Sequence, residues 1–335
     1  MVAGRKRKTT SSCRRYRELR GSATIADMSE NDDSVRRGVP YAFTAFAIWG
    51  LLPLYWKALS AVDAASILAC RVVFSLAFIW IVLALRGNPA WPRIFADAKA
   101  RITLLLSAAL IGINWGLYIW AVNSGRTVEA SLGYYINPLV NVFFGTIFFR
   151  ERLTRLRWFS FALASAGVVA LSASTGSIPW ISLVLAVSFS LYGLAKKAAG
   201  LDPLEALGAE TLALAPLALA YLAFRGASGE SVLNHSFPVL ALLAFSGIVT
   251  ALPLLAFAVG AKLLPLSVLG FIQYISPTLQ LALGVLAFGE PFPAERLFAF
   301  VLVWAALIIY SASYLPRSRR PRQPATPGAG RRRRP

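Results

Sequence analysis

The sequence contains little cysteine and almost no histidine, and this scarcity excludes several kinds of site. Two cysteines, Cys13 and Cys70, do not build a disulfide framework. The single histidine, His235, lies in a loop and is not expected to form a metal site or serve as the base of a buried triad. We therefore expect no metal and no cofactor.

Common catalytic signatures are absent as well. The chain has no Gly-x-x-x-x-Gly-Lys-Ser/Thr phosphate loop, so no ATP-driven pump is built in. It has neither His-Glu-x-x-His nor Gly-x-Ser-x-Gly, which are signatures of common hydrolases. We expect a protein that is not an enzyme.

Apolar sequence is what the chain has in excess. Hydrophobic residues make up 57% of the 335 residues, and the 15% that are charged cluster between long apolar runs. A soluble domain is nearer half apolar, and runs of about 20 apolar residues predict membrane-spanning helices. We expect an all-α membrane protein with ten transmembrane helices, at approximately 39–56, 64–85, 102–121, 127–149, 156–174, 178–195, 203–224, 238–260, 265–288 and 294–314.

Basic residues gather at the two ends of the chain. Of the 34 Lys and Arg residues, ten lie in residues 1–38 and eight in residues 316–335, where no apolar periodicity occurs. We interpret both stretches as disordered basic cytoplasmic tails near anionic lipid, and we expect no nucleic-acid partner. No cleavable signal peptide is expected, and a translation start at Met28 in place of Met1 is a hypothesis.

The remaining basic residues indicate how the spans are oriented. Lys and Arg favour short cytoplasmic loops. With the N-terminus inside, the inner loops hold eleven Lys and Arg residues and the outer loops hold four. An even number of spans returns the C-terminus to the cytoplasm, so the charge distribution agrees with ten spans.

The sequence repeats itself after 139 positions. In this register Tyr135 meets Tyr274, Pro138 meets Pro277, Gly145 meets Gly284 and Glu151 meets Glu290. We interpret the chain as two copies of a five-span unit, residues 39–174 and 178–314. Because five is odd, the second copy enters the membrane in the opposite sense, which is the inverted repeat typical of secondary transporters.

The prolines of the repeat predict bends. Pro138 and Pro277 lie about half-way along their spans, and each removes a backbone hydrogen bond there. Either the two helices bend around a central cavity, or packing tolerates two kinks. Nearby polar side chains that can satisfy the freed carbonyls are Asn137, Asn141, Gln273, Ser276 and Gln280.

Two ionisable residues lie inside apolar runs, where charge is costly and usually functional. Arg71 and Glu210 are each about two turns into a span, and they are also 139 positions apart. We expect them to face each other or a shared cavity, as an ion pair or a gate; alternatively, each snorkels to an opposite surface. Proton carriers, if any, are Glu129, Glu205 or Glu210.

Aromatic and amide side chains form the second candidate group. Asn114, Trp115 and Tyr118 lie deep in the third expected span and suggest an inward face. Such a group can hold a neutral or zwitterionic molecule that contains an aromatic ring. The expected cavity lining is completed by Tyr135, Asn137, Asn141, Gln273 and Tyr274, whereas an interfacial belt is expected to contain Trp56, Trp91, Trp158, Trp180 and Trp304.

Four stretches resemble the RarD proteins, which belong to the EamA branch of the drug/metabolite transporter superfamily. They are Trp49-Gly-Leu-Leu-Pro-Leu-Tyr-Trp-Lys57, Asn114-Trp-Gly-Leu-Tyr-Ile-Trp-Ala-Val-Asn123, Glu129-Ala-Ser-Leu-Gly-Tyr-Tyr-Ile-Asn-Pro-Leu-Val-Asn-Val142 and Leu269-Gly-Phe-Ile-Gln-Tyr-Ile-Ser-Pro-Thr-Leu-Gln280. The resemblance implies ten helices in two EamA-type repeats, in the bacterial inner membrane, with both termini cytoplasmic. It also implies an exporter of the kind named for chloramphenicol sensitivity. The family often has histidine where this chain has Cys70.

Together these features predict a secondary transporter that exports small organic metabolites or drugs by alternating access. Its expected partners are a small-molecule substrate, the lipid bilayer and protons as a coupling ion. A flippase for lipids or lipid-linked precursors is the first alternative, and a membrane enzyme is the second.

Overall fold

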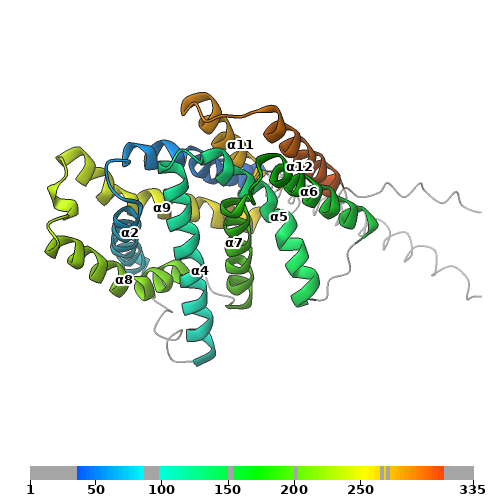
Figure 1. Ribbon diagram of the computed structural model, residues 1–335. Coiled ribbons are helices and arrows are strands. Elements are labelled where there is room, and N and C mark those ends of the chain that lie inside the picture. Colours follow the sequence, from blue (N-terminus) through cyan, green and yellow to red (C-terminus); the bar gives the residue numbers. More distant parts are fainter. Residues whose placement is uncertain are drawn as a thin grey trace, which may run out of the picture.

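Helices make up the described part of the chain. The computed structural model describes residues 36–86, 98–149, 154–199, 203–264, 268 and 272–312, and no strand occurs among them. The all-α prediction is confirmed. The helices, shown in Figure 1, are a first helix at Arg36–Ala58 followed by α2 (Ala64–Arg86), α4 (Ala98–Asn123), α5 (Thr127–Phe149), α6 (Arg155–Thr175), α7 (Trp180–Ala199), α8 (Pro203–Ala227), η1 (Val232–Asn234), α9 (Phe237–Leu263), α11 (Ile275–Ala282), the π-helical turn η2 (Leu283–Ala287) and α12 (Ala294–Ala312).

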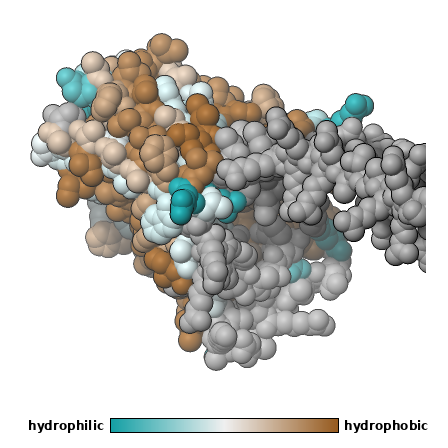
Figure 2. Space-filling model, turned by 90° about the vertical axis from the view of Figure 1, so that its right-hand side faces the viewer, coloured by the Kyte–Doolittle hydropathy of each residue, from teal (hydrophilic) through white to brown (hydrophobic). Residues whose placement is uncertain are grey.

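The helices have the length and surface of a multi-pass membrane protein. Six of them are long and apolar enough to cross a bilayer, namely the first helix, α2, α4, α6, α8 and α9, and two shorter apolar helices cover Trp180–Ala195 and Ile275–Ala287. Large apolar side chains such as Leu85, Leu217 and Ile308 are exposed, and hydrophobic residues cover most of the coloured face in Figure 2. Lipid tails stabilise such a surface, whereas water does not. The count of ten spans and the two tails stay predictions, since residues 1–35, residues 316–335 and part of the expected ninth span lie outside the described residues.

Turn residues end the helices where the sequence predicts breaks. Four loop glycines adopt positive φ angles that other residues rarely adopt, and each lies at an expected break: Gly125, Gly176, Gly229 and Gly289. A more distant residue caps α5, because the Glu290 carboxylate accepts hydrogen bonds from the backbone N–H groups of Thr127 and Val128, at 2.7 and 2.8 Å. A carboxylate at a helix N-terminus satisfies free donors and complements the helix dipole.

The two prolines of the expected repeat have different settings. Pro138 lies inside α5, and that helix continues through it to Phe149. Pro277 is the third residue of α11, in the first turn, where the missing N–H would have no helical partner. Pro277 therefore starts a helix, and its role as a bending point stays a prediction.

Small residues bring the early and late helices into backbone contact. The main pairs are α5 with α7, α6 with α12, α2 with α8 and α9, and α4 with α7, and Figure 1 shows α6 and α12 side by side. Each pair joins a helix before Thr175 to a helix after Pro179. A Cβ added at Gly133 would lie 2.7 Å from the Ser182 carbonyl oxygen, and one added at Gly247 would lie 2.3 Å from the Phe74 carbonyl oxygen. Such contacts replace the hydrophobic driving force that lipid removes.

Gly247→Ala should therefore destabilise the protein. Its new methyl group overlaps the α2 backbone, and overpacking of this kind costs about 1–3 kcal/mol. Thermal unfolding in detergent should show a clear fall in midpoint. The matched control is Gly226→Ala in α8, where nothing lies within 4 Å and alanine favours the helix; its midpoint should stay the same or rise. Equal midpoints for both variants would contradict the close approach of α2 and α9.

Candidate functional site

Arg71 is a buried cation between two indole rings. Its side chain projects from α2 and is 4% exposed. Its Nε donates a hydrogen bond to Thr250 Oγ1 of α9 at 2.9 Å. The guanidinium carbon lies 3.9 Å from the ring centroid of Trp115 and 5.0 Å from that of Trp56. Both rings thus face the charge.

The interactions that Arg71 makes do not neutralise its charge. Among the described residues no carboxylate pairs with it, and Thr250 accepts from only one of its five N–H groups. Cation–π contacts contribute about 0.5–2 kcal/mol each, whereas burying an ion costs several kcal/mol even after relaxation. The aromatic contacts alone therefore leave the site short of a counter-charge.

Two further donors near Arg71 have no acceptor in the described structure. They are Trp56 Nε1, on a ring that faces the guanidinium, and the Tyr118 hydroxyl, and both atoms are buried. The phenol groups of Tyr55, Tyr118 and Tyr134 lie within electrostatic range of Arg71. A buried donor without a partner costs about 1–3 kcal/mol, so two such donors near a cation that lacks a counter-charge indicate a missing acceptor.

The expectation for Trp56 was wrong. Its position at the end of the first helix predicts a place in the interfacial belt, but its side chain is 0% exposed. The reason is that the last turn of the first helix packs into the main core cluster, beside Leu59 and Ile67. Trp158 and Trp180, by contrast, are about half exposed, and Trp91 lies outside the described residues. Trp304 is packed against Tyr135 and Phe300.

Asn114 fixes the helices around the site and does not present a free amide. Its Nδ2 donates to the Leu185 carbonyl and to Ser188 Oγ, both at 3.0 Å, which ties α4 to α7. Its Oδ1 accepts from the Tyr134 hydroxyl at 3.3 Å. The ring of Tyr134 meets that of Tyr118 edge to face. Asn114 thereby positions the tyrosines that lie near Arg71.

Glu210 is buried, but it does not pair with Arg71. Its carboxylate accepts hydrogen bonds from Ser107 Oγ of α4 and from the Tyr192 hydroxyl of α7, the latter at 3.1 Å. The expected direct ion pair is therefore wrong, and so is snorkelling, since Arg71 and Glu210 are at most 4% exposed.

The register of α2 and α8 explains why the two charges stay apart. The helices run antiparallel: Asp63, before α2, contacts Arg225 near the end of α8, whereas Gly208 packs on Ile79. Glu210 then lies about opposite Ala77, about six residues and 9 Å along the axis from Arg71. Arg71 reaches α9 and Glu210 reaches α4, so each charge contacts a helix from the other half of the chain.

The other expected lining residues form a second group, between α5 and α11. The Tyr135 hydroxyl lies 2.7 Å from Thr278 Oγ1, and its ring stacks on Tyr274 with centroids 6.4 Å apart. Asn137 Oδ1 accepts from Ser190 Oγ of α7 at 2.6 Å. Gln273 is half-buried, and the side chain of Asn141 lies outside the described residues. The expected lining thus divides into an Arg71 group and an α5–α11 group.

Gln280 links α11 to the first helix. Its Nε2 donates to the Trp49 carbonyl at 3.3 Å and to Ser276 Oγ at 3.1 Å. Gly50 allows this approach, because a Cβ added there would lie 2.8 Å from Leu279. The polar residues around Pro277 therefore hold helices together.

Sequence reasoning missed the partners of the two buried charges. Thr250, Ser107 and Tyr192 lie in apolar runs and were not singled out. Each is a polar side chain inside an apolar helix, and this would have been the signal. Asp63 was also missed, because it lies in a short loop between two expected spans.

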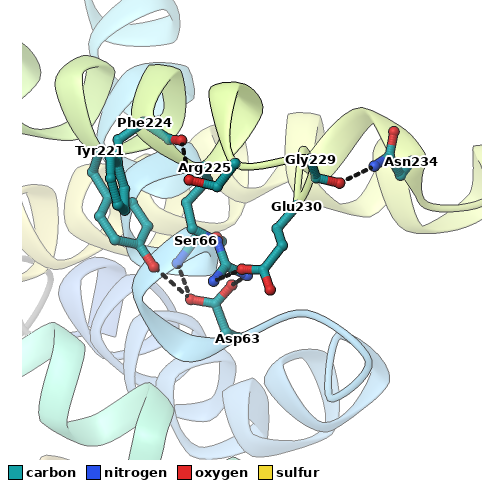
Figure 3. Close-up of polar contacts among 9 residues, drawn as sticks. Asp63, Ser66, Tyr221, Phe224, Arg225, Gly229, Glu230 and Asn234 are labelled. Atoms are coloured by element: carbon teal, nitrogen blue, oxygen red, sulfur yellow. Dashed lines mark hydrogen bonds and ion pairs between the residues drawn. The ribbon is translucent and has the colours of Figure 1, made fainter.

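Asp63 joins the start of α2 to the end of α8 (Figure 3). Its carboxylate accepts hydrogen bonds from the Ser66 backbone N–H and the Tyr221 hydroxyl, both at 2.9 Å, and pairs with Arg225 at 3.0 Å. Arg225 also pairs with Glu230. Partial burial raises the pKa of Asp63, but the hydrogen bonds from Ser66 and Tyr221 and the charge of Arg225 outweigh it, so the pKa lies below its ordinary value.

The sequence is similar to a known transporter family and to several of its members. Residues 36–173 match the model of the EamA-like transporter family. "Protein RarD" of Streptomyces exfoliatus is 45% identical over 88% of this chain and 93% of its own length. "Uncharacterized transporter YojE" of Bacillus subtilis is 44% identical over 83% and 94%, and "Chloramphenicol-sensitive protein RarD" of Pseudomonas aeruginosa is 35% identical over 82% and 93%.

A solved structure shares the fold. A chain titled "Crystal structure of protein" aligns with 83% of this chain and 98% of its own length, with a TM-score of 0.57 and 20% sequence identity. At this identity the likeness concerns the arrangement of helices alone.

The low pKa of Asp63 predicts how the contact between α2 and α8 depends on pH. A carboxylate with a depressed pKa stabilises the fold above its unfolded pKa, near 3.8, and this stability is lost as pH falls below that value. Asp63→Asn keeps the helix cap but removes the charge. Because the side chain is 37% exposed, its unfolding free energy at pH 7 should fall by no more than about 1 kcal/mol. Unfolding midpoints in detergent should differ at pH 7, and the difference should shrink as pH falls from 3.8 through the lower pKa of the folded state. A difference that does not shrink below pH 3.8 would contradict this account.

Proposed function

The chain belongs to the RarD proteins of the EamA transporter family, and on this premise we propose that it is a secondary transporter that exports small organic molecules by alternating access. A multi-pass membrane protein of this family needs a polar site shared by helices that move relative to one another. The single observation that carries the proposal is the buried Arg71, which is held by helices from both halves of the chain. A fixed charge there can bind a substrate midway across the bilayer.

We propose an inverted repeat of two five-span units, residues 39–174 and 178–314, as the frame of the transporter. The contacts between helices support it, because they occur in pairs related by the shift of 139 positions. The contact of α2 with α9 corresponds to that of α8 with α4, and the contact of α4 with α7 corresponds to that of α9 with the first helix. The equivalent residues Tyr135 and Tyr274 stack on each other. The model of the family matches residues 36–173, which is close to the first unit of 39–174.

In this frame ten spans cross the bacterial inner membrane, with both termini cytoplasmic. The contact of Asp63 with Arg225 then lies at the outer face and holds the ends of α2 and α8 together. A transporter of this kind opens one face at a time. The contact supports a state in which the outer face is closed, and opening requires Asp63 and Arg225 to separate.

Inside-out vesicles that contain the purified protein test the function. Uptake of a small molecule into such vesicles, driven by an ion gradient, would support export. Candidate compounds come from untargeted metabolomics of the medium of cells with and without the gene. A dependence on lipid substrates would favour the flippase, and chemical turnover without net transport would favour the enzyme. An unchanged medium would contradict an exporter.

Glu210 is the carboxylate that we expect to carry the coupling proton. It is buried, and its carboxylate accepts a hydrogen bond from Ser107 of α4, a helix of the opposite half. Glu210→Gln should abolish the response of transport to a pH gradient while counterflow persists. Glu205→Gln, five residues earlier on α8 and half-buried, is the matched control and should respond as the native protein does. A full response in Glu210→Gln would exclude Glu210 as the proton carrier.

A further inference from the structure

We propose that the transported molecule is a small organic carboxylate, and that Arg71 binds its carboxylate group. This inference rests on the proposed transport function and names the substrate class of the same site. It differs from the expectation from sequence, in which amides and rings pointed to a neutral or zwitterionic molecule. The difference rests on the charge of Arg71 and on the hydrogen-bond donors around it.

The geometry of Arg71 leaves its charged end available. Thr250 Oγ1 accepts from Nε, so the two terminal nitrogens keep their N–H groups for another partner. These two nitrogens form a planar fork that matches the two oxygens of a carboxylate. Within the described residues no acidic side chain uses this fork, and Glu210 is engaged by Ser107 and Tyr192.

The unpartnered donors are an independent sign of an absent acceptor. Trp56 Nε1 belongs to the ring 5.0 Å from the guanidinium carbon, and it is buried without a hydrogen-bond partner. The Tyr118 hydroxyl is also buried without a hydrogen-bond partner, and it lies within electrostatic range of Arg71. A carboxylate has about four acceptor positions, so one group can satisfy the fork and both neutral donors.

The walls of the site suggest the rest of the ligand. The ring of Trp115 lies 3.9 Å from the guanidinium carbon, and the rings of Tyr55 and Trp56 meet edge to face with centroids 4.9 Å apart. Aromatic walls of this kind favour a flat or apolar body. An amino acid would also bring an ammonium group close to its carboxylate. Near Arg71 this second cation would be repelled, and Glu210, the buried carboxylate on the helix packed against α2, lies about 9 Å away along the helix axis.

The test compares phenylacetate with phenylacetamide, which has the same body without the charge. Binding is measured on the purified, full-length protein in detergent, by tryptophan fluorescence. We expect phenylacetate to bind at least about tenfold more tightly than phenylacetamide, since charge-assisted hydrogen bonds are stronger than neutral ones. Equal affinity for the two compounds would overturn the proposal. Tighter binding of phenylphosphonate than of phenylacetate would overturn the assignment of a carboxylate.

Substitutions around Arg71 test whether phenylacetate binds at this site. Arg71→Lys keeps the charge but loses the fork, so phenylacetate should bind about tenfold more weakly, whereas the exposed Arg126→Lys should bind as the native protein does. Trp56→Phe and Tyr118→Phe each remove one unpartnered donor. Both should weaken phenylacetate binding about fivefold. Tyr118→Phe keeps the ring and should leave the unfolding midpoint unchanged or higher, because an unpaired buried donor is lost, whereas Trp56→Phe also shrinks a fully buried ring and should lower the midpoint. These two variants decide the question if Arg71→Lys does not fold. Unaltered phenylacetate binding in all three would overturn the proposal.

Proteoliposome counterflow separates this inference from the proposed function. If phenylacetate binding depends on Arg71 but no carboxylate crosses the membrane, the transport function fails and the anion site stands. If neutral compounds cross and Arg71→Lys leaves their rate unchanged, the transport function stands and the anion site fails.

Discussion

The central constraint on this structure is the free energy needed to keep the guanidinium of Arg71 out of water among the surrounding helices. Burying a cation costs several kcal/mol, and the indole rings and Thr250 return only part of that. A protein that only needed stability would place an apolar residue there. The energetic deficit instead suits a site that is completed by an anion from outside. Each turnover then alternates between an occupied site of low energy and an empty site of higher energy.

Close packing of the helices offsets the unfavourable free energy of burying Arg71. Glycines at positions such as 133 and 247 allow backbones to touch, so helices from the two halves hold the site from several sides. Asn114 and Glu210 use their polar groups between helices, where each hydrogen bond fixes a neighbouring element. The Asp63–Arg225 contact closes one end of the same pair, α2 and α8. Movement of these two helices would change the end contact and the charged site together.

Much of the fold could be predicted from the sequence, because bilayer thickness and turn chemistry constrain it strongly. Helices occur at the expected ranges in the described structure, and positive φ at Gly125 and Gly176 marks two of the expected breaks. The buried charge at Arg71 was equally accessible, since a cation in an apolar run is unusual. These features depend on local composition, so they need no knowledge of which helices touch.

What the sequence could not provide was the contact partners of each residue. A shift of 139 positions relates Arg71 to Glu210 as equivalents, and equivalence does not make two residues neighbours. Their separation depends on the antiparallel register of α2 and α8, which appears only in the structure. Trp56 was misassigned for a similar reason: its place near a helix end predicted a lipid interface, whereas the surrounding helices bury it.

The most direct test of an uncompensated charge at Arg71 is to supply the missing counter-charge within the protein. Thr250→Asp places a carboxylate beside Arg71 Nε, and Thr250→Asn places a neutral group of nearly the same shape there. The account predicts that thermal unfolding of Thr250→Asp in detergent has a clearly higher midpoint than that of Thr250→Asn. A lower midpoint for Thr250→Asp than for Thr250→Asn would show that Arg71 already has a counter-charge, and it would contradict the account.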